Sequence, residues 1–259
     1  MAYLKTETDK RGVSTITLNR PENHNAMDRG FIDEFSQALG HLNSNTRVLV
    51  ITASGRHFCG GADIKWMRAS AELSETENMA DAMALSNLLE TLNAFSKPTI
   101  ARVSGAALGG GTGLVCCCDI VVADDTAQFG FPEVRLGILP ATISPYVIAA
   151  IGPRLARRYF LTGERIDSLE AYHLGMIHDV CSADTIQRHV EDQISALLEG
   201  GSEAQSATKQ LIRDVTHRPV DETLRTELAR RLAHIRAGTE AQEGLKAFLE
   251  KRPARWQTS

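Results

Sequence analysis

The sequence predicts an α/β protein with a parallel sheet and a helical C-terminal region. Strand-like apolar runs alternate with helical patterns from residue 14 to residue 123. Two glycine-rich turns each follow a strand-like run and precede a predicted helix. Beyond residue 186 only helical spacing is evident. With 259 residues, of which 43% are hydrophobic, the chain is long enough to bury a large core.

The first half of the chain contains the predicted strands. Apolar and polar residues alternate over 14–18, and residues 48–51 form the continuous apolar run that is typical of a buried parallel strand. Shorter strands are predicted over 99–103 and 120–123. The helices between them are a segment with Phe31, Phe35, Leu39 and Leu42 on one face, a helix that begins at Asp63, and a long helix over 74–95.

The second half is predicted to be helical, with no strand. Pro153 occupies a position typical of the first residue of a helix. Helical spacing covers 186–198 and 204–215, and a last long helix carries Leu224, Leu228, Leu232 and Ile235 on one stripe. We therefore expect an α/β core over residues 1–200 and a helical subdomain over 201–259. That subdomain must bury its stripe against its own core or against a neighbouring subunit.

Charge and cysteine content narrow the functional classes. The net charge of −4 comes without a dense basic run, so nucleic acid is not an expected partner. The five cysteines are odd in number, and Cys116–Cys118 are consecutive, which suits neither a disulfide framework nor a zinc site. No metal is expected. No segment is apolar for 18 residues, so no membrane span is expected either. A cytoplasmic protein is predicted, and a matrix protein without its presequence remains the alternative.

The two glycine-rich turns are the main candidates for chemistry. They are Gly60-Gly61-Ala62-Asp63 and the run 105–111. Glycine lets a ligand approach the backbone, and the first amides of a helix have no internal partner. Two such turns can aim free N–H groups at one oxygen and form an oxyanion hole. A tight strand-to-helix connection and a phosphate cradle are the alternatives, although the run does not fit the usual phosphate-binding glycine patterns.

Three sequence motifs, which occur in the same order along the chain, resemble those of a known family. They are FCGGADIKWM, VSGAALGGGTGL followed by CDI, and AQFGFPEVRLGILP. Together they are similar to the crotonase, or enoyl-CoA hydratase/isomerase, superfamily, and the resemblance runs from about Thr15 to about Arg252. It implies a crotonase (ClpP-like) fold of repeated ββα units with a helical C-terminal trimerisation region. The implied assembly is a homotrimer or a dimer of trimers. The implied ligand is an acyl-CoA substrate, with no cofactor beyond the coenzyme A that the substrate carries.

The resemblance also implies roles for individual residues. Ala62 and Gly110 match the two oxyanion donors, and Glu133 matches a catalytic glutamate. Residues that match the substrate or coenzyme A contacts are Asn25, Ala26, Met27, Asp63, Ile64, Lys65, Leu108 and Gly109. Lys251 and Arg252 match a terminal basic segment that reaches a coenzyme A phosphate, commonly in a neighbouring subunit. For these last two, solvated surface charges are the alternative.

Two departures from the family pattern narrow the range of reactions that we expect. Typical hydratases carry a second glutamate where this chain has Gly113, so the mechanism with two carboxylates cannot operate unaltered. The stretch 139–146 also departs by placing hydroxyl groups near the acyl pocket. Both features resemble hydro-lyases for branched, carboxylated 2-enoyl-CoAs, of the 3-methylglutaconyl-CoA type in leucine breakdown and the isohexenylglutaconyl-CoA type in acyclic terpene breakdown. We hypothesise that the substrate's own distal carboxylate partly replaces the missing glutamate.

The resemblance also leaves other functions on the same scaffold open. A Δ3,Δ2-enoyl-CoA isomerase also uses a single glutamate, and decarboxylases and thioester hydrolases share the fold. A non-catalytic binding protein is the alternative of a different class. His24, His57 and His178 lie outside the motif positions and are expected to be structural. Asp119 is expected to serve as a turn or cap carboxylate.

Overall fold

The computed structural model describes residues 2–42 and 45–257, and its main sheet has six strands in the order β1-β2-β3-β4-β6-β9. Every neighbouring pair is parallel except β1 and β2. The strands are β1 (Leu4–Thr8), β2 (Val13–Leu18), β3 (Val48–Ala53), β4 (Thr99–Val103), β6 (Ile120–Asp124) and β9 (Asp179–Cys181). The parallel α/β core predicted from the sequence is confirmed.

A second, three-stranded sheet contains strands that the sequence did not predict. It consists of β5 (Ala106–Leu108), β7 (Gln128–Gly130) and β8 (Arg165–Asp167). The expectation that the second half would be free of strands was wrong, because β8 and β9 both lie there. Strands of three residues are too short for an alternating pattern to show, and only their pairing with distant segments defines them.

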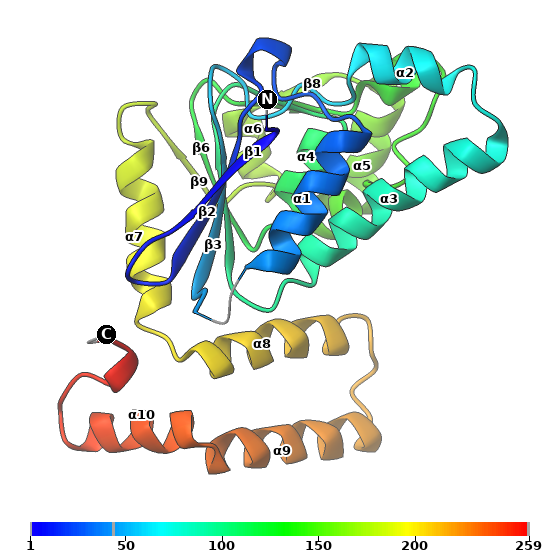
Figure 1. Cartoon of the computed structure of the whole chain (residues 1–259). Helices are drawn as coiled ribbons and strands as arrows, with labels where there is room; N and C mark the ends of the chain where they lie inside the picture. The colour runs from blue at the N-terminus through cyan, green and yellow to red at the C-terminus, as the bar shows by residue number, and fades with distance from the viewer. Residues whose placement is uncertain (1, 43–44, 258–259) are drawn as a thin grey trace.

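Helices cover both faces of the main sheet (Figure 1). On one side lie α1 (Arg29–His41), α3 (Glu75–Asn93), α4 (Gly110–Cys116) and α5 (Ser144–Thr162), and on the other lies α7 (Ile186–Leu198). The short helices are α2 (Ile64–Ser70) and α6 (Ser168–His173). In the described part of the chain, no helix is long and apolar enough to cross a membrane.

Two apolar clusters explain why β3 is hydrophobic at consecutive positions. Val48 and Val50 face α7, and the residues of that helix in their cluster are Ile186, Val190 and Ile194. Leu49 and Ile51 face the opposite cluster, beneath α1 and α3. Because both faces of β3 are buried here, all four residues from 48 to 51 are apolar.

Two predicted helix boundaries are reproduced by specific local contacts. Asp63 caps α2 by accepting hydrogen bonds from the Lys65 and Trp66 amides. Ser74 caps α3 and forms a reciprocal capping box with Glu77. In α5, Gly152 has a non-helical φ of +76°, so Pro153 begins a new helical segment, as its position predicted.

The C-terminal region consists of α8 (Ser202–Val215), α9 (Glu222–Ala237) and α10 (Thr239–Leu249). Figure 1 shows these helices below the core, at the end opposite α2. Leu232, Leu245, Phe248 and Leu249 are exposed there. The subdomain predicted over 201–259 ends beyond the described residues.

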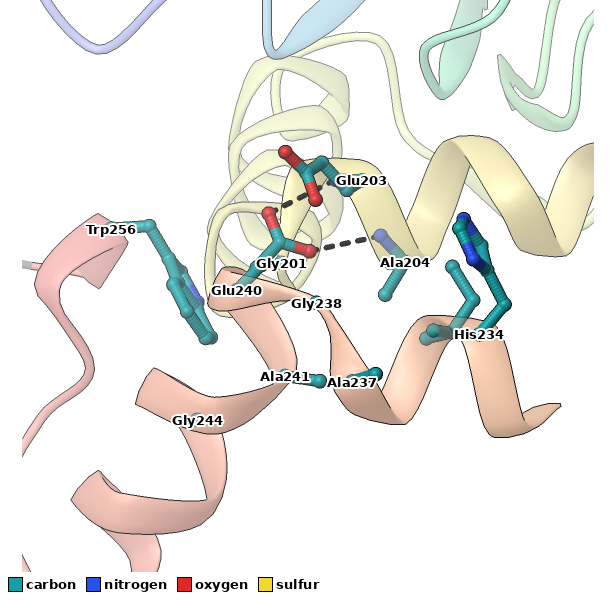
Figure 2. A pocket seen from close by; sticks show the side chains of 11 residues that line it. Gly201, Glu203, Ala204, His234, Ala237, Gly238, Glu240, Ala241, Gly244 and Trp256 are labelled. Carbon is teal, nitrogen blue, oxygen red and sulfur yellow. Dashed lines mark hydrogen bonds between the residues drawn. The ribbon is translucent and has the colours of Figure 1, made fainter. Parts of the chain in front are cut away.

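A carboxylate from α10 holds α8 in place (Figure 2). Glu240 accepts hydrogen bonds from the Glu203 and Ala204 amides at 3.0 and 2.9 Å, and Gly201 supplies no side-chain cap to α8. The residues that make these contacts line a cavity of about 290 Å³, and the Trp256 ring borders it. Glu240 therefore caps α8 from a different helix.

We expect Glu240→Ala to lower the free energy of unfolding by about 1–2 kcal/mol, because two helix-end amides lose a charged acceptor. Urea denaturation measures the change. Glu203→Gln is the matched control: it removes an exposed charge from the same turn, and a shift within about 0.5 kcal/mol is expected. Equal effects of the two substitutions would contradict the capping role.

Candidate active site

The first glycine-rich turn is held between two other segments. Cys59 forms an isolated parallel bridge with Ala107, in which the Cys59 amide donates to the Ala106 carbonyl at 2.9 Å. The Leu108 amide donates to the Cys59 carbonyl at 3.0 Å. The turn after β3 is thereby fixed against β5, which leads into the second turn.

A second bridge leaves the Ala62 amide free. Met27 pairs with Ala62, and the amides that donate are those of Met27 and Asp63, each at 2.7 Å. In this parallel bridge the Ala62 N–H is not used, and it donates no backbone hydrogen bond within the described residues. Ala62 is also an exposed residue.

The second turn places Gly110 at the start of α4. Gly109, with φ of +50°, precedes the helix, and its own amide donates to the Gly130 carbonyl at 2.9 Å. Gly110 is the first helical residue, so its N–H has no carbonyl partner inside the helix. The buried Thr112 hydroxyl donates to the Ala107 carbonyl at 2.7 Å and anchors this start.

The two turns touch each other. A Cβ at Gly61 would lie 3.2 Å from the Leu108 carbonyl oxygen, and a Cβ at Gly111 would lie 2.8 Å from the Cys59 carbonyl oxygen. Larger residues at either position would force the turns apart. The structure therefore brings together the segments that carry Ala62 and Gly110.

Glu133 lies beside the second turn, in the short helix η2 (Pro132–Leu136). Its Oε1 is 2.8 Å from the position that a Cβ on Gly109 would take. Its Oε2 is buried and has no hydrogen-bond partner among the described residues. Phe129 and Phe131 are fully buried next to it. Burial raises the pKa of Glu133 above its ordinary value, which is typical of a catalytic carboxyl group.

Ile143 occupies the space that a second carboxylate would need. A Cβ at Gly113 would overlap Ile143 Cγ2 and would lie 3.0 Å from Ile143 Cβ. Leu89 Cδ2 would be 3.6 Å away. The family resemblance implied that Gly113 stands where typical hydratases carry a second glutamate, but it did not single out Ile143. Only the packing of α5 against α4 identifies that residue.

The predicted coenzyme A contacts divide into loop-forming and exposed residues. The Asn25 side chain is buried, accepts a hydrogen bond from the Arg20 amide and donates to the Ser54 and His57 carbonyls. It therefore shapes the loop that carries Ala26 and Met27. Ile64 and Lys65 are exposed next to Ala62, and together they offer a ligand an apolar surface and a positive charge.

The terminal basic pair is not brought to this site within one chain. Lys251 and Arg252 follow α10, which lies at the opposite end of the molecule from α2 (Figure 1). Arg252 is already paired with Glu243 and Glu250 at 2.7 and 2.8 Å. Lys251 is exposed.

The remaining polar candidates make hydrogen bonds, ring contacts or ion pairs with other segments of the chain. His57 Nδ1 accepts a hydrogen bond from the Ala106 amide, and His178 Nδ1 accepts one from the Val121 amide. The His24 ring packs against the His57 ring with centroids 5.0 Å apart. Asp119 accepts from the Thr99 amide and pairs with Lys209.

Two glycine turns that meet beside a half-buried glutamate, on an α/β core with a helical C-terminal region, define the protein as a member of the crotonase superfamily. More particularly, the chain belongs to the enoyl-CoA hydratase/isomerase family, whose model matches residues 8–259. It is therefore an enzyme of the enoyl-CoA hydratase type.

Individual relatives match nearly the whole chain. A probable enoyl-CoA hydratase of Mycobacterium bovis is 37% identical over 253 residues, which cover 95% of this chain and 94% of the relative. The 2,3-dehydroadipyl-CoA hydratase of Escherichia coli K12 is 36% identical over 244 residues, 93% of each chain. The crystal structure of an enoyl-CoA hydratase from Shewanella pealeana has a TM-score of 0.95 at 41% identity and covers 98% of this chain and 96% of its own.

Proposed function

We propose that this enzyme adds water to a branched, carboxylated 2-enoyl-CoA, with Ala62 and Gly110 as oxyanion donors and Glu133 as the catalytic acid and base. The observation that carries the proposal is the buried, unpartnered Oε2 of Glu133, whose Oε1 faces Gly109. A buried acceptor without a partner costs free energy, so it fits a group that finds its partner in substrate or water.

The proposed reaction uses one carboxylate for both proton transfers. Glu133 takes a proton from water, and the water oxygen forms a bond to C3 of the acyl group. The C2–C3 double-bond electrons move to the thioester, whose oxygen becomes an enolate oxygen held by the Ala62 and Gly110 amides. Glu133 then returns its proton to C2, and the thioester carbonyl is restored. No cofactor is needed beyond the coenzyme A of the substrate.

We infer the carboxylated substrate from the missing second glutamate. With Ile143 filling that space, the protein supplies one carboxylate to the water, and a substrate carboxylate is the proposed second. The name of the Escherichia coli relative, 2,3-dehydroadipyl-CoA hydratase, also denotes a substrate with a free distal carboxylate. The proposed esters are of the 3-methylglutaconyl and isohexenylglutaconyl types, from leucine and acyclic terpene breakdown.

A turnover panel of crotonyl-CoA, 3-methylglutaconyl-CoA, isohexenylglutaconyl-CoA and a 3-enoyl-CoA tests the proposal. We expect the highest kcat/KM for a branched glutaconyl ester, with oxygen from ¹⁸O-labelled water in the product. Preference for crotonyl-CoA would reject the carboxylated substrate. Conversion of the 3-enoyl ester without label would support the isomerase, the second candidate, which the single carboxylate also suits.

The pH dependence of hydration should follow Glu133. The group accepts a proton from water only as a carboxylate, so we expect kcat/KM to rise with pH through its pKa. Burial places that pKa above the ordinary 4.5 of a glutamate, so the inflection is expected above pH 4.5. An acid limb at or below pH 4.5, measured with a substrate well below KM, would contradict this environment.

We further propose a homotrimer, or a dimer of trimers, in the cytoplasm. The exposed Phe248 and Leu249, 81% and 78% accessible in one chain, are suited to burial against a neighbouring subunit. The five cysteines are free, which favours a reducing compartment. Light scattering coupled to gel filtration gives the subunit number, and a monomer would contradict the proposed assembly.

A further inference from the structure

The side chains on the two sides of the second glycine-rich turn differ in polarity. On the side of Gly109, the side-chain atoms nearest to the position of an added Cβ are those of the Glu133 carboxylate. On the side of Gly110, they are Met27 Sδ at 2.9 Å and Leu85 Cδ2 at 4.0 Å. An acyl group held at the Gly110 amide therefore lies between a carboxyl group and apolar side chains.

The apolar side continues one helical turn further along α4. Gly110 and Gly113 are three residues apart, so they share a helix face. The nearest atoms to a Cβ at Gly113 belong to Ile143 and Leu89. We define Met27, Leu85, Leu89 and Ile143 as the apolar wall. Leu85 is partly exposed, whereas Ile143 is only 2% exposed and closes the inner end of the wall.

We propose that Ile143 is a specificity-determining residue that limits the size of the apolar C3 substituent the acyl pocket admits. The inference rests on the proposed function, which places C3 beside Glu133. Gly113 has no side chain, so the volume at the inner end is set mainly by Ile143, whose atoms lie closest to it. A shorter residue at position 143 opens space into which a longer branch extends.

The test compares kcat/KM for isohexenylglutaconyl-CoA with kcat/KM for 3-methylglutaconyl-CoA, which differ in the apolar branch on C3. We expect Ile143→Ala to raise this ratio at least about tenfold, because each methylene accommodated in an apolar pocket is worth about 10- to 200-fold. Ile143→Val should give a smaller shift in the same direction. An unchanged ratio in either folded variant would overturn the proposal.

Val147→Ala is the matched control, since Val147 is fully buried one turn further along α5. It should lower Tm as Ile143→Ala does but leave the ratio unchanged. If it shifts the ratio equally, the effect comes from general loosening of α5, and the assignment to Ile143 fails.

A second measurement tests the contact and does not depend on the substrate. Gly113→Ala should lower Tm in the wild-type background and cost clearly less in the Ile143→Ala background, because the overlap with Cγ2 is gone. Additive effects would overturn the steric argument. If the wild type converts neither glutaconyl ester, the proposed substrate class fails, and the ratio is measured with C3-methyl and longer C3-alkyl 2-enoyl-CoAs that lack the carboxylate.

Discussion

Glu133→Gln is expected to lower kcat for hydration by about 10²- to 10⁴-fold or more while the CoA ester still binds. The amide keeps the shape of the carboxyl group but cannot take a proton from water. Stopped-flow or steady-state absorbance of the enoyl thioester measures the rate, and calorimetric titration with a non-reacting acyl-CoA measures binding. Full activity in this variant would refute the assignment of Glu133.

The same substitution should stabilise the fold at neutral and higher pH. Burial raises the pKa of Glu133, so the folded state binds this proton more tightly than the unfolded chain does. Stability contributed by the group is therefore lost as pH rises above about 4.5, and the Gln variant avoids that loss. We expect its Tm to exceed that of the wild type at pH 8 and the difference to shrink toward pH 4.5.

Glu164→Gln is the control for both measurements. Glu164 pairs with Arg158 at 2.8 Å, which holds the pKa of its carboxyl below the ordinary value. Removing its charge should leave activity near the wild-type value and should destabilise the fold at neutral pH, the opposite sign to the Glu133 variant. The same sign in both variants would contradict the environment described for Glu133.

Gly109→Ala is expected to lower kcat/KM by about 10²-fold, because the new methyl group would lie 2.8 Å from Glu133 Oε1. Displacing the carboxylate by about 1 Å is enough for a loss of that size. The backbone at this position also has a φ of +50° and a ψ of −119°, outside the regions that L-residues normally adopt, and an alanine there costs about 1–3 kcal/mol. Activity and urea denaturation are measured on the same preparation.

Gly137→Ala separates the effect of backbone strain from the effect of the contact with Glu133. Gly137 also has a positive φ, +74°, and ends the short helix that carries Glu133, but a Cβ there would have no neighbour within 4 Å. Gly137 lies in the left-handed helical region, so we expect a smaller loss of stability, about 1 kcal/mol, with little change in kcat/KM. If Gly137→Ala inactivates the enzyme as strongly as Gly109→Ala does, backbone strain rather than the contact with Glu133 explains the loss.

Local patterns predicted the elements whose residues carry their own signal. The apolar run 48–51 identified β3, and the helices predicted to begin at Asp63 and Ser74 are α2 and α3, which those residues cap. These predictions held because the burial of a strand and the capping of a helix depend on neighbouring residues. The strands β5, β7, β8 and β9 carried no such signal, since three residues show no period and their partners are distant in sequence.

By itself, the sequence determined the family, the two glycine turns and the glutamate at position 133, because those features are written in contiguous motifs. Only the tertiary structure decided how they meet. The Cys59–Ala107 bridge joins the two turns, the Met27–Ala62 bridge fixes the first turn to the loop at Met27, and Ile143 fills the space beside Gly113. These contacts join segments up to tens of residues apart. Their geometry depends on packing across the whole core, which no local pattern encodes.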